Sequence, residues 1–193
     1  MPGLAELLAP EERARLVQWR RAEDRERFLL GRAVLRLCLG ELLDRAPAGL
    51  VLDLGPRGKP FLADGDGLHP RGVPRFNVAH SGELVLLGFH GAREVGVDVE
   101  CHRPELGWRP IALRCLPPHE VRRIEAQPPE LQAMAFLQAW CALEAGLKAR
   151  GVGLGGLERL EEASKPLQVG SGSLRRLWQV ALPTGYAGAA ALV

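Results

Sequence analysis

The sequence predicts an α+β protein of two pseudo-symmetric lobes, mainly because a weak internal repeat divides it. In each half a long apolar helix is followed by Lys-Pro and then by a Ser/Thr-Gly step into a strand of small residues. The matching positions are Phe28 and Phe136, Lys59 and Lys165, and Ser81 and Thr184. We therefore expect an N-terminal lobe over residues 1–93 and a C-terminal lobe over 94–193. A ligand site is expected at the seam between the lobes, where duplicated folds commonly bind.

Four helices are expected from the apolar periodicity. They cover residues 10–21, 23–44, 117–125 and 129–149. The first begins at Pro10, whose missing amide hydrogen costs nothing at a helix start. Glu11 and Glu12 follow in the first turn, where negative charge interacts favourably with the helix dipole.

Seven strands are expected from alternating or β-branched segments between turn residues. They lie near residues 49–54, 60–63, 75–79, 83–90, 94–100, 175–182 and 186–193. The alternation is regular over 94–100, where every second position is valine. Residues 64–74 and 150–156 are rich in proline or glycine and read as loops.

Composition excludes several classes of protein. At 193 residues and 47% hydrophobic content the chain can bury an ample core and is not disordered. The 25 Lys and Arg against 23 Asp and Glu are too balanced to predict nonspecific nucleic-acid binding. Arginine is nevertheless concentrated in residues 13–36, which suits a ligand that carries phosphate.

Neither a secretory signal nor a membrane span is expected, because charged residues interrupt every apolar run early. We therefore expect a cytoplasmic protein with no membrane partner. The cysteines have no Cys-x-x-Cys spacing, so we read them as reduced thiols rather than as a zinc site or disulfide framework. They are Cys38, Cys101, Cys115 and Cys141.

The acidic residues with the clearest chemical meaning are Glu144, Asp98 and Glu100. Glu144 is the only charged residue of the apolar stretch 133–147, where an ionised carboxylate is costly unless a cation meets it. Lys148, four residues on, could be that partner. The strand period of two places Asp98 and Glu100 on one face. Two strand carboxylates with a helix carboxylate make a typical magnesium site.

Plainer readings of these residues stay open at this point. Glu144 and Lys148 could be an ordinary helical ion pair, and Asp-x-Glu could be a solvated strand edge. Cys101 and His102 directly follow the acidic strand, but hard oxygen ligands favour magnesium over zinc.

Four motifs together resemble the 4′-phosphopantetheinyl transferases, in particular the two-lobed, Sfp-type subgroup. The motifs are Gly58-Lys59-Pro60, Phe76-Asn77-Val78-Ala79-His80-Ser81-Gly82, Gly96-Val97-Asp98-Val99-Glu100 and Trp140 to Ala149 with Glu144 and Lys148. Each motif is weak alone, but four in order at suitable spacing are specific. The resemblance covers about residues 10–155 and implies the 4′-phosphopantetheinyl transferase-like fold.

The resemblance implies a magnesium-dependent enzyme. It would transfer 4′-phosphopantetheine from coenzyme A to a serine of an apo acyl or peptidyl carrier protein and release adenosine 3′,5′-bisphosphate. Asp98, Glu100 and Glu144 would hold Mg²⁺, with Asp98 also on the coenzyme A side. Glu144 would accept the serine proton, directly or through a metal-bound water, and Lys148 would stabilise charge on the transferred phosphate.

The resemblance also implies a coenzyme A site. Lys59, with Pro60 beside it, and His80 match positions that bind the coenzyme A phosphates, notably the 3′-phosphate. Arg15 stands where relatives carry a basic nucleotide contact, although an exposed helical arginine is an equal alternative. Arg27 matches a basic position before the long helix, or is only a member of a structural ion pair.

Three departures from the family pattern weaken the match locally. Leu143 replaces the usual lysine before the helix glutamate, and Ala79 replaces the usual serine before the histidine. The opening strand of relatives is also not recognisable before Pro10. A noncatalytic coenzyme A or carrier-protein binding relative is therefore kept as an alternative, and an unrelated magnesium-dependent nucleotide enzyme as a third.

A docking surface for the carrier is expected over residues 108–137. This segment combines apolar side chains, about half of which should be core, with arginines that could attract an acidic carrier. The apolar residues are Trp108, Ile111, Leu113, Leu116, Leu131 and Met134, and the basic ones are Arg109, Arg114, Arg122 and Arg123. We expect a monomer, because both lobes lie in one chain.

Overall fold

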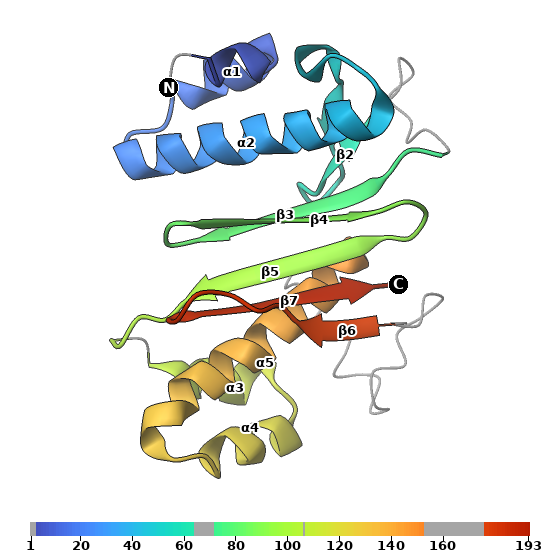
Figure 1. The fold of residues 1–193 in the computed structure, drawn as a ribbon. Coiled ribbons are helices and arrows are strands. Elements are labelled where there is room, and N and C mark those ends of the chain that lie inside the picture. Colours follow the sequence, from blue (N-terminus) through green and yellow to red (C-terminus); the bar gives the residue numbers. More distant parts are fainter. Residues whose placement is uncertain (1–2, 64–71, 106, 153–175) are drawn as a thin grey trace.

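The computed structural model describes residues 3–63, 72–105, 107–152 and 176–193, and it has the expected mixture of helices and antiparallel sheets (Figure 1). Its helices are η1 (Ala5–Leu7), α1 (Pro10–Leu16), α2 (Ala22–Leu43), η2 (Pro47–Gly49), α3 (Trp108–Cys115), α4 (Pro118–Glu125) and α5 (Pro129–Ala149). Its strands are β1 (Leu52–Leu54), β2 (Pro60–Leu62), β3 (Arg75–Ser81), β4 (Leu84–His90), β5 (Val95–Cys101), β6 (Arg176–Gln179) and β7 (Tyr186–Leu192).

In the first half of the chain, helix α2 packs on one face of the antiparallel β3–β4 pair (Figure 1). Leu35 and Leu39 of α2 are fully buried and pack with Phe76 of β3. Arg36, only 1% exposed, donates to Glu12 Oε2 at 2.6 Å and to the carbonyl of Pro47 at 2.7 Å. This buried arginine therefore ties α1 and η2 to the long helix.

In the second half, the sheet has the order β5-β7-β6 and carries α5 on one face (Figure 1). The face of β7 toward α5 is made of alanines, Ala187, Ala189 and Ala191, all buried. Because alanine is short, the helix can approach the sheet closely. The α3 and α4 helices pack on the outer side of α5, where Ala112 and Ile124 are fully buried.

The α+β class and the four predicted helices are confirmed, although α1 stops at Leu16. Helix α3 was not predicted, because Pro110 argues against a helix there. In the structure Pro110 lies in the first turn, where a missing amide hydrogen is tolerated. Lys165-Pro166, which the predicted repeat requires, lies outside the described residues. None of the helices in the described part of the chain is long and apolar enough to cross a membrane.

Helix α5 and strand β5 approach each other very closely at Gly96. A β-carbon built on Gly96 would overlap the backbone of α5 at the Ala145 carbonyl oxygen and the Ala149 amide nitrogen. Ala145 and Ala149 are themselves fully buried. The absence of a side chain at residue 96 thus sets the distance between the helix and the strand.

The seam between the two halves is formed by β3 and β5, which lie side by side (Figure 1). Val95, Val97 and Val99 of β5 pack with Ala79 of β3. Asn77 Oδ1 accepts a hydrogen bond from the backbone amide of Val97 at 2.8 Å. The backbone amide of Val97 is therefore bonded to a side chain of β3 and not to a backbone carbonyl.

We expect Gly96→Ala to destabilise the protein by about 3 kcal/mol, the upper end of the usual range for overpacking, because the overlap is with backbone atoms that cannot rotate away. Gly91→Ala is the matched control, since a β-carbon there meets nothing within 4 Å. Urea unfolding of both variants measures the difference. Equal stabilities would show that α5 moves away from β5 without cost.

Candidate active site at the seam

One face of α5 delivers the candidate catalytic side chains to the sheet. Cys141, Glu144, Ala145 and Lys148 follow the three- and four-residue spacing of one helical face. Gly96 lies against this face, and the strand period of two puts Asp98 on the same side of β5. The contact at Gly96 therefore also brings Lys148 to Asp98.

Lys148 and Asp98 form a short ion pair between α5 and β5. Lys148 Nζ lies 2.6 Å from Asp98 Oδ1, and the Asp98 side chain is only 6% exposed. The other carboxylate oxygen, Asp98 Oδ2, is buried without a hydrogen-bond partner. The i,i+4 spacing on the helix had suggested Glu144 as the partner of Lys148. In the structure the lysine bonds to Asp98 of the strand instead.

Burial and neighbouring negative charge raise the pKa values of Glu144 and Glu100. Burial, and then the charges of Asp98 and Glu100, raise the pKa of Glu144, while Lys148 opposes the shift. Burial and the charge of Asp98 likewise raise the pKa of Glu100, and a hydrogen bond from Ser81 opposes it. The three carboxylates therefore share one electrostatic environment in which negative charge is incompletely compensated.

This donor set fits a hard divalent cation. An orphaned carboxylate oxygen and two carboxylates with raised pKa values are what a bound cation would relieve. In the part of the chain that the structure describes, however, no three acidic, histidine or cysteine side chains converge as a complete metal site. In this structure the ammonium of Lys148 bonds to Asp98 and supplies part of the positive charge that the carboxylates require.

Ser81 was not singled out from the sequence, yet it touches the acidic strand. Its hydroxyl donates to Glu100 Oε2 at 2.8 Å and accepts from the Cys101 amide at 3.1 Å. The signal was present in the His80-Ser81-Gly82 motif, where attention went to the histidine. Ser81 comes from β3, so both halves of the chain contribute to the surroundings of Glu100.

Lys59 lies at the other end of the seam. Its ammonium donates to Glu94 Oε2 at 2.8 Å and to the Val95 carbonyl at 3.0 Å. Arg75 also pairs with Glu94, at 3.3 Å. Pro60, the next residue, begins β2. Neither Glu94 nor Arg75 was expected from the sequence.

His80 is exposed and lies next to Ser81, near the opposite end of β3 from Arg75. Lys59 bonds to Glu94, which also pairs with Arg75 at the start of β3. At about 3.3 Å per strand residue, His80 lies roughly 17 Å further along the seam. Strand alternation puts His80 on the α2 side of β3, with Phe76 and Val78. The structure therefore does not bring Lys59 and His80 together.

Arg15 lies beside the first half of α2. Its guanidinium carbon is 5.8 Å from the centre of the Phe28 ring, and that of Arg32 is 5.7 Å away. Burial lowers the pKa of Arg32, and the attraction of Glu12 offsets only part of this shift. Two guanidinium groups thus share one ring at the His80 end of α2. Arg27 pairs with Asp24 at 3.5 Å, in keeping with a structural role.

The segment proposed for carrier docking forms α3, α4 and the start of α5. Leu113 and Leu131 are 58% and 50% exposed. The other apolar residues of this segment, Trp108, Ile111, Leu116 and Met134, belong to or pack against the core of this half. Arg109 pairs with Glu125 at 2.7 Å, and Arg123 with Glu120 at 2.8 Å. Arg114 and Arg122 are exposed.

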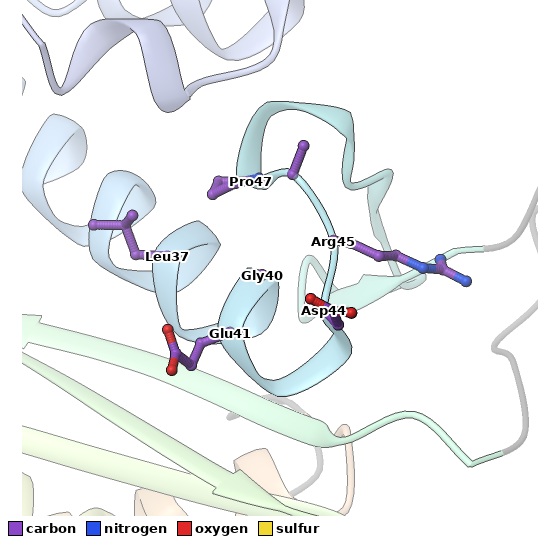
Figure 2. Close-up of a pocket in the computed structure, with 7 residues that line it drawn as sticks. Leu37, Gly40, Glu41, Asp44, Arg45 and Pro47 are labelled. Carbon is purple, nitrogen blue, oxygen red and sulfur yellow. The ribbon is translucent and has the colours of Figure 1, made fainter.

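A pocket at the C-terminal end of α2 is separate from these residues. Figure 2 shows Glu41, Asp44 and Arg45 around it, with Leu37 and Pro47. None of the site residues predicted from the sequence lines it. Asp44 ends the helix in a left-handed conformation, with φ of 51°. This pocket belongs to the helix end and not to the acidic site.

Comparison with known proteins covers nearly the whole chain. Residues 94–186 match the family model of the 4′-phosphopantetheinyl transferase superfamily, and residues 3–90 match that of the N-terminal part of a 4′-phosphopantetheinyl transferase. The chain is 40% identical over 156 residues to slr0495 of Synechocystis sp., which is named provisionally as a 4′-phosphopantetheinyl transferase; the match covers 81% of this chain and 62% of that protein.

Two further relatives carry the same activity in their names. The 4′-phosphopantetheinyl transferase HetI of Nostoc sp. is 35% identical over 87% of this chain and 70% of its own length. AcpT of Salmonella typhi is 34% identical over 66% of this chain and 59% of its own length. The matched part of the chain therefore spans about three fifths to seven tenths of the length of these relatives.

Lys148→Met should destabilise the protein in chelator, because it leaves the Asp98 charge buried without a partner. We expect a loss of about 2–4 kcal/mol, at or below the range for buried pairs because Lys148 is partly exposed. The double variant Lys148→Met with Asp98→Asn should recover most of it, since no charge is then stranded. Urea unfolding measures all three proteins. A double variant no more stable than Lys148→Met would mean that lysine packing, not charge pairing, matters.

Proposed function

We propose, from the premise that this chain belongs to the 4′-phosphopantetheinyl transferase superfamily, that it modifies carrier proteins. It would transfer the 4′-phosphopantetheine of coenzyme A to a serine of an apo carrier and release adenosine 3′,5′-bisphosphate. The observation that supports this most is the buried Asp98–Lys148 pair beside Glu100 and Glu144 at the seam. The noncatalytic alternative is not favoured, because the relatives are named as transferases.

We propose that Asp98, Glu100 and Glu144 hold a magnesium ion. When bound, such an ion would neutralise charge on the coenzyme A pyrophosphate. Lys148 lies close enough to Asp98 to contribute its own positive charge to the transferred phosphate. Compensation of the acidic charges by a cation is the physical reason for this assignment.

Glu144 would act as the base for the acceptor serine. A carboxylate that holds a cation is a poor base, so the serine proton would reach Glu144 through a water rather than directly. The serine oxygen would attack the β-phosphorus as its proton leaves through that water. The bond from phosphorus to the adenosine bisphosphate oxygen breaks in the same displacement.

The nucleotide end of coenzyme A would bind through Arg15, Lys59, Pro60 and His80. Arg15 and His80 are supported by their position at the same end of α2, where Arg32 adds a further cation. Lys59 would have to share or exchange its bond to Glu94 to reach a phosphate. We assign the 3′-phosphate in the first place to His80.

Finer features of the protein remain part of this proposal. We propose lobes over residues 1–93 and 94–193, membership of the two-lobed, Sfp-type subgroup, and a monomer that works in the cytoplasm without nucleic acid. Helix α2 on β3–β4 and helix α5 on β5–β7 support the two-lobe division.

Turnover should depend on a divalent cation. Mass spectrometry of an apo carrier incubated with coenzyme A and Mg²⁺ should show one added phosphopantetheine. Chelator should abolish transfer, and Asp98→Ala or Glu144→Gln should cut its rate by roughly two orders of magnitude or more. Full activity of the protein in excess chelator would end the magnesium proposal but not the transferase assignment.

Loss of His80 should lower the affinity for coenzyme A more than the affinity for dephospho-coenzyme A. A charge-assisted contact to phosphate is worth about 1.5–3 kcal/mol, so His80→Ala should cost roughly tenfold to hundredfold in affinity. Lys59→Ala is compared in the same titration calorimetry. If either variant lost the same affinity for coenzyme A and for dephospho-coenzyme A, the assignment of that residue to the 3′-phosphate would be wrong.

We propose that an acidic carrier docks over α3 and α4. Leu113 and Leu131 offer exposed apolar surface, and Arg114 and Arg122 offer exposed charge. Arg123 lies beside them, although Glu120 neutralises part of its charge. Charges at the rim of an interface act mainly on the rate of association.

Charge reversal on α4 should therefore affect the carrier alone. Arg122→Glu with Arg123→Glu should raise the KM for the carrier severalfold at low salt and leave coenzyme A affinity unchanged. Arg45→Glu with Arg57→Glu makes the same change of charge on exposed residues of the first half of the chain, and it is the control. Equal effects of the two double variants would indicate long-range attraction without a docking surface on α4.

A further inference from the structure

We propose that Ser81 is a positioning residue for Glu100, through which the first half of the chain shapes the acidic site of the second. This inference rests on the proposed function, because it concerns the cation site assigned above. Ser81 is 6% exposed and belongs to β3, whereas Glu100 belongs to β5. Its role is thus to act on a ligand across the seam.

The hydroxyl of Ser81 has a defined orientation. The amide of Cys101 donates to its oxygen at 3.1 Å, so one lone pair is occupied. Its single proton is directed to Glu100 Oε2 at 2.8 Å. A hydroxyl held from both sides cannot rotate freely, and its bond fixes one oxygen of the carboxylate.

Glu100 needs such a constraint more than Asp98 does. Asp98 is buried and paired with Lys148, but Glu100 is near the end of β5 and only partly buried. The charge of Arg103 also acts on Glu100. Without Ser81, Glu100 Oε2 loses the hydrogen bond that fixes its position.

The turn that follows Ser81 is anchored independently. The hydroxyl of Tyr186, at the start of β7, accepts a hydrogen bond from the Glu83 amide at 3.0 Å. Gly82 has a φ of 55° and lies so close to Tyr186 and Cys101 that a β-carbon would collide with them. Removing the Ser81 hydroxyl should therefore leave the turn in place, while it frees the Glu100 carboxylate and the Cys101 amide from their bonds to Ser81.

Tyr186 supplies the matched control. Like Ser81, it bonds the β3–β4 hairpin to the second half of the chain, but its hydrogen bond is from a backbone amide and it has no bond to a carboxylate. Tyr186→Phe tests the turn, Ser81→Ala tests the hydroxyl on Glu100, and Ser81→Thr restores a hydroxyl. All three are compared with the unsubstituted full-length protein.

The readout is stabilisation by the metal ion alone, measured by thermal unfolding over a range of Mg²⁺ concentrations without coenzyme A. Loss of a hydrogen-bond partner of a ligand commonly weakens metal binding tenfold or more. We expect Ser81→Ala to raise the Mg²⁺ concentration of half-maximal stabilisation about tenfold, Ser81→Thr to recover most of this, and Tyr186→Phe to change it less than twofold. In chelator, Ser81→Ala should unfold within a few degrees of the unsubstituted protein.

Two results would overturn the proposal while the cation site survives. One is a normal Mg²⁺ response of Ser81→Ala. The other is an equal shift in Tyr186→Phe, which would assign the effect to the turn. If the unsubstituted protein gained no stability from Mg²⁺, the cation site and the role of Ser81 would fall together. Transfer activity, tested separately, would still decide the proposed reaction.

Discussion

The close packing of α5 on β5 at Gly96 is the constraint on which the rest of the site depends. A side chain there would occupy the same space as the backbone of the helix at Ala145 and Ala149. Since Lys148 lies between these two contact residues on α5, the same approach brings its ammonium to 2.6 Å from Asp98. The short alanine side chains of β7 also pack against the helix along the neighbouring strand. Small residues therefore determine the position of the charged ones.

The site combines charges that would be unfavourable separately. Asp98 is buried with one oxygen bonded to lysine and the other without a partner. Glu100 and Glu144 both have pKa values raised by burial, and each is also affected by the charge of Asp98. Such an arrangement lowers the stability of the fold and is typical of functional sites. Its cost is met by the apolar packing of α5, where Cys141, Ala145 and Ala149 are fully buried.

Much of this could be predicted from the sequence because the patterns are local. Valine at every second position identified β5 and placed Asp98 and Glu100 on one face, and a lone charge in an apolar helix identified Glu144. The partner of Lys148 could not be predicted in the same way, because i,i+4 spacing within a helix says nothing about a strand that packs on it. Ser81, Glu94 and Arg75 were missed for a related reason, since each bonds across the seam to a residue distant in sequence. Helix α3 was missed because proline is tolerated in a first turn.

The seam between β3 and β5 has a consequence for how mutations act on this protein. Backbone ladders can be formed by almost any sequence, because every residue except proline carries the same donor and acceptor. Here the polar contacts from β3 to the β5 amides are made by the side chains of Asn77 and Ser81. The alignment of the two halves is therefore specified by the identity of particular residues. A single base change in the gene could loosen it while each half kept its own helix, sheet and core.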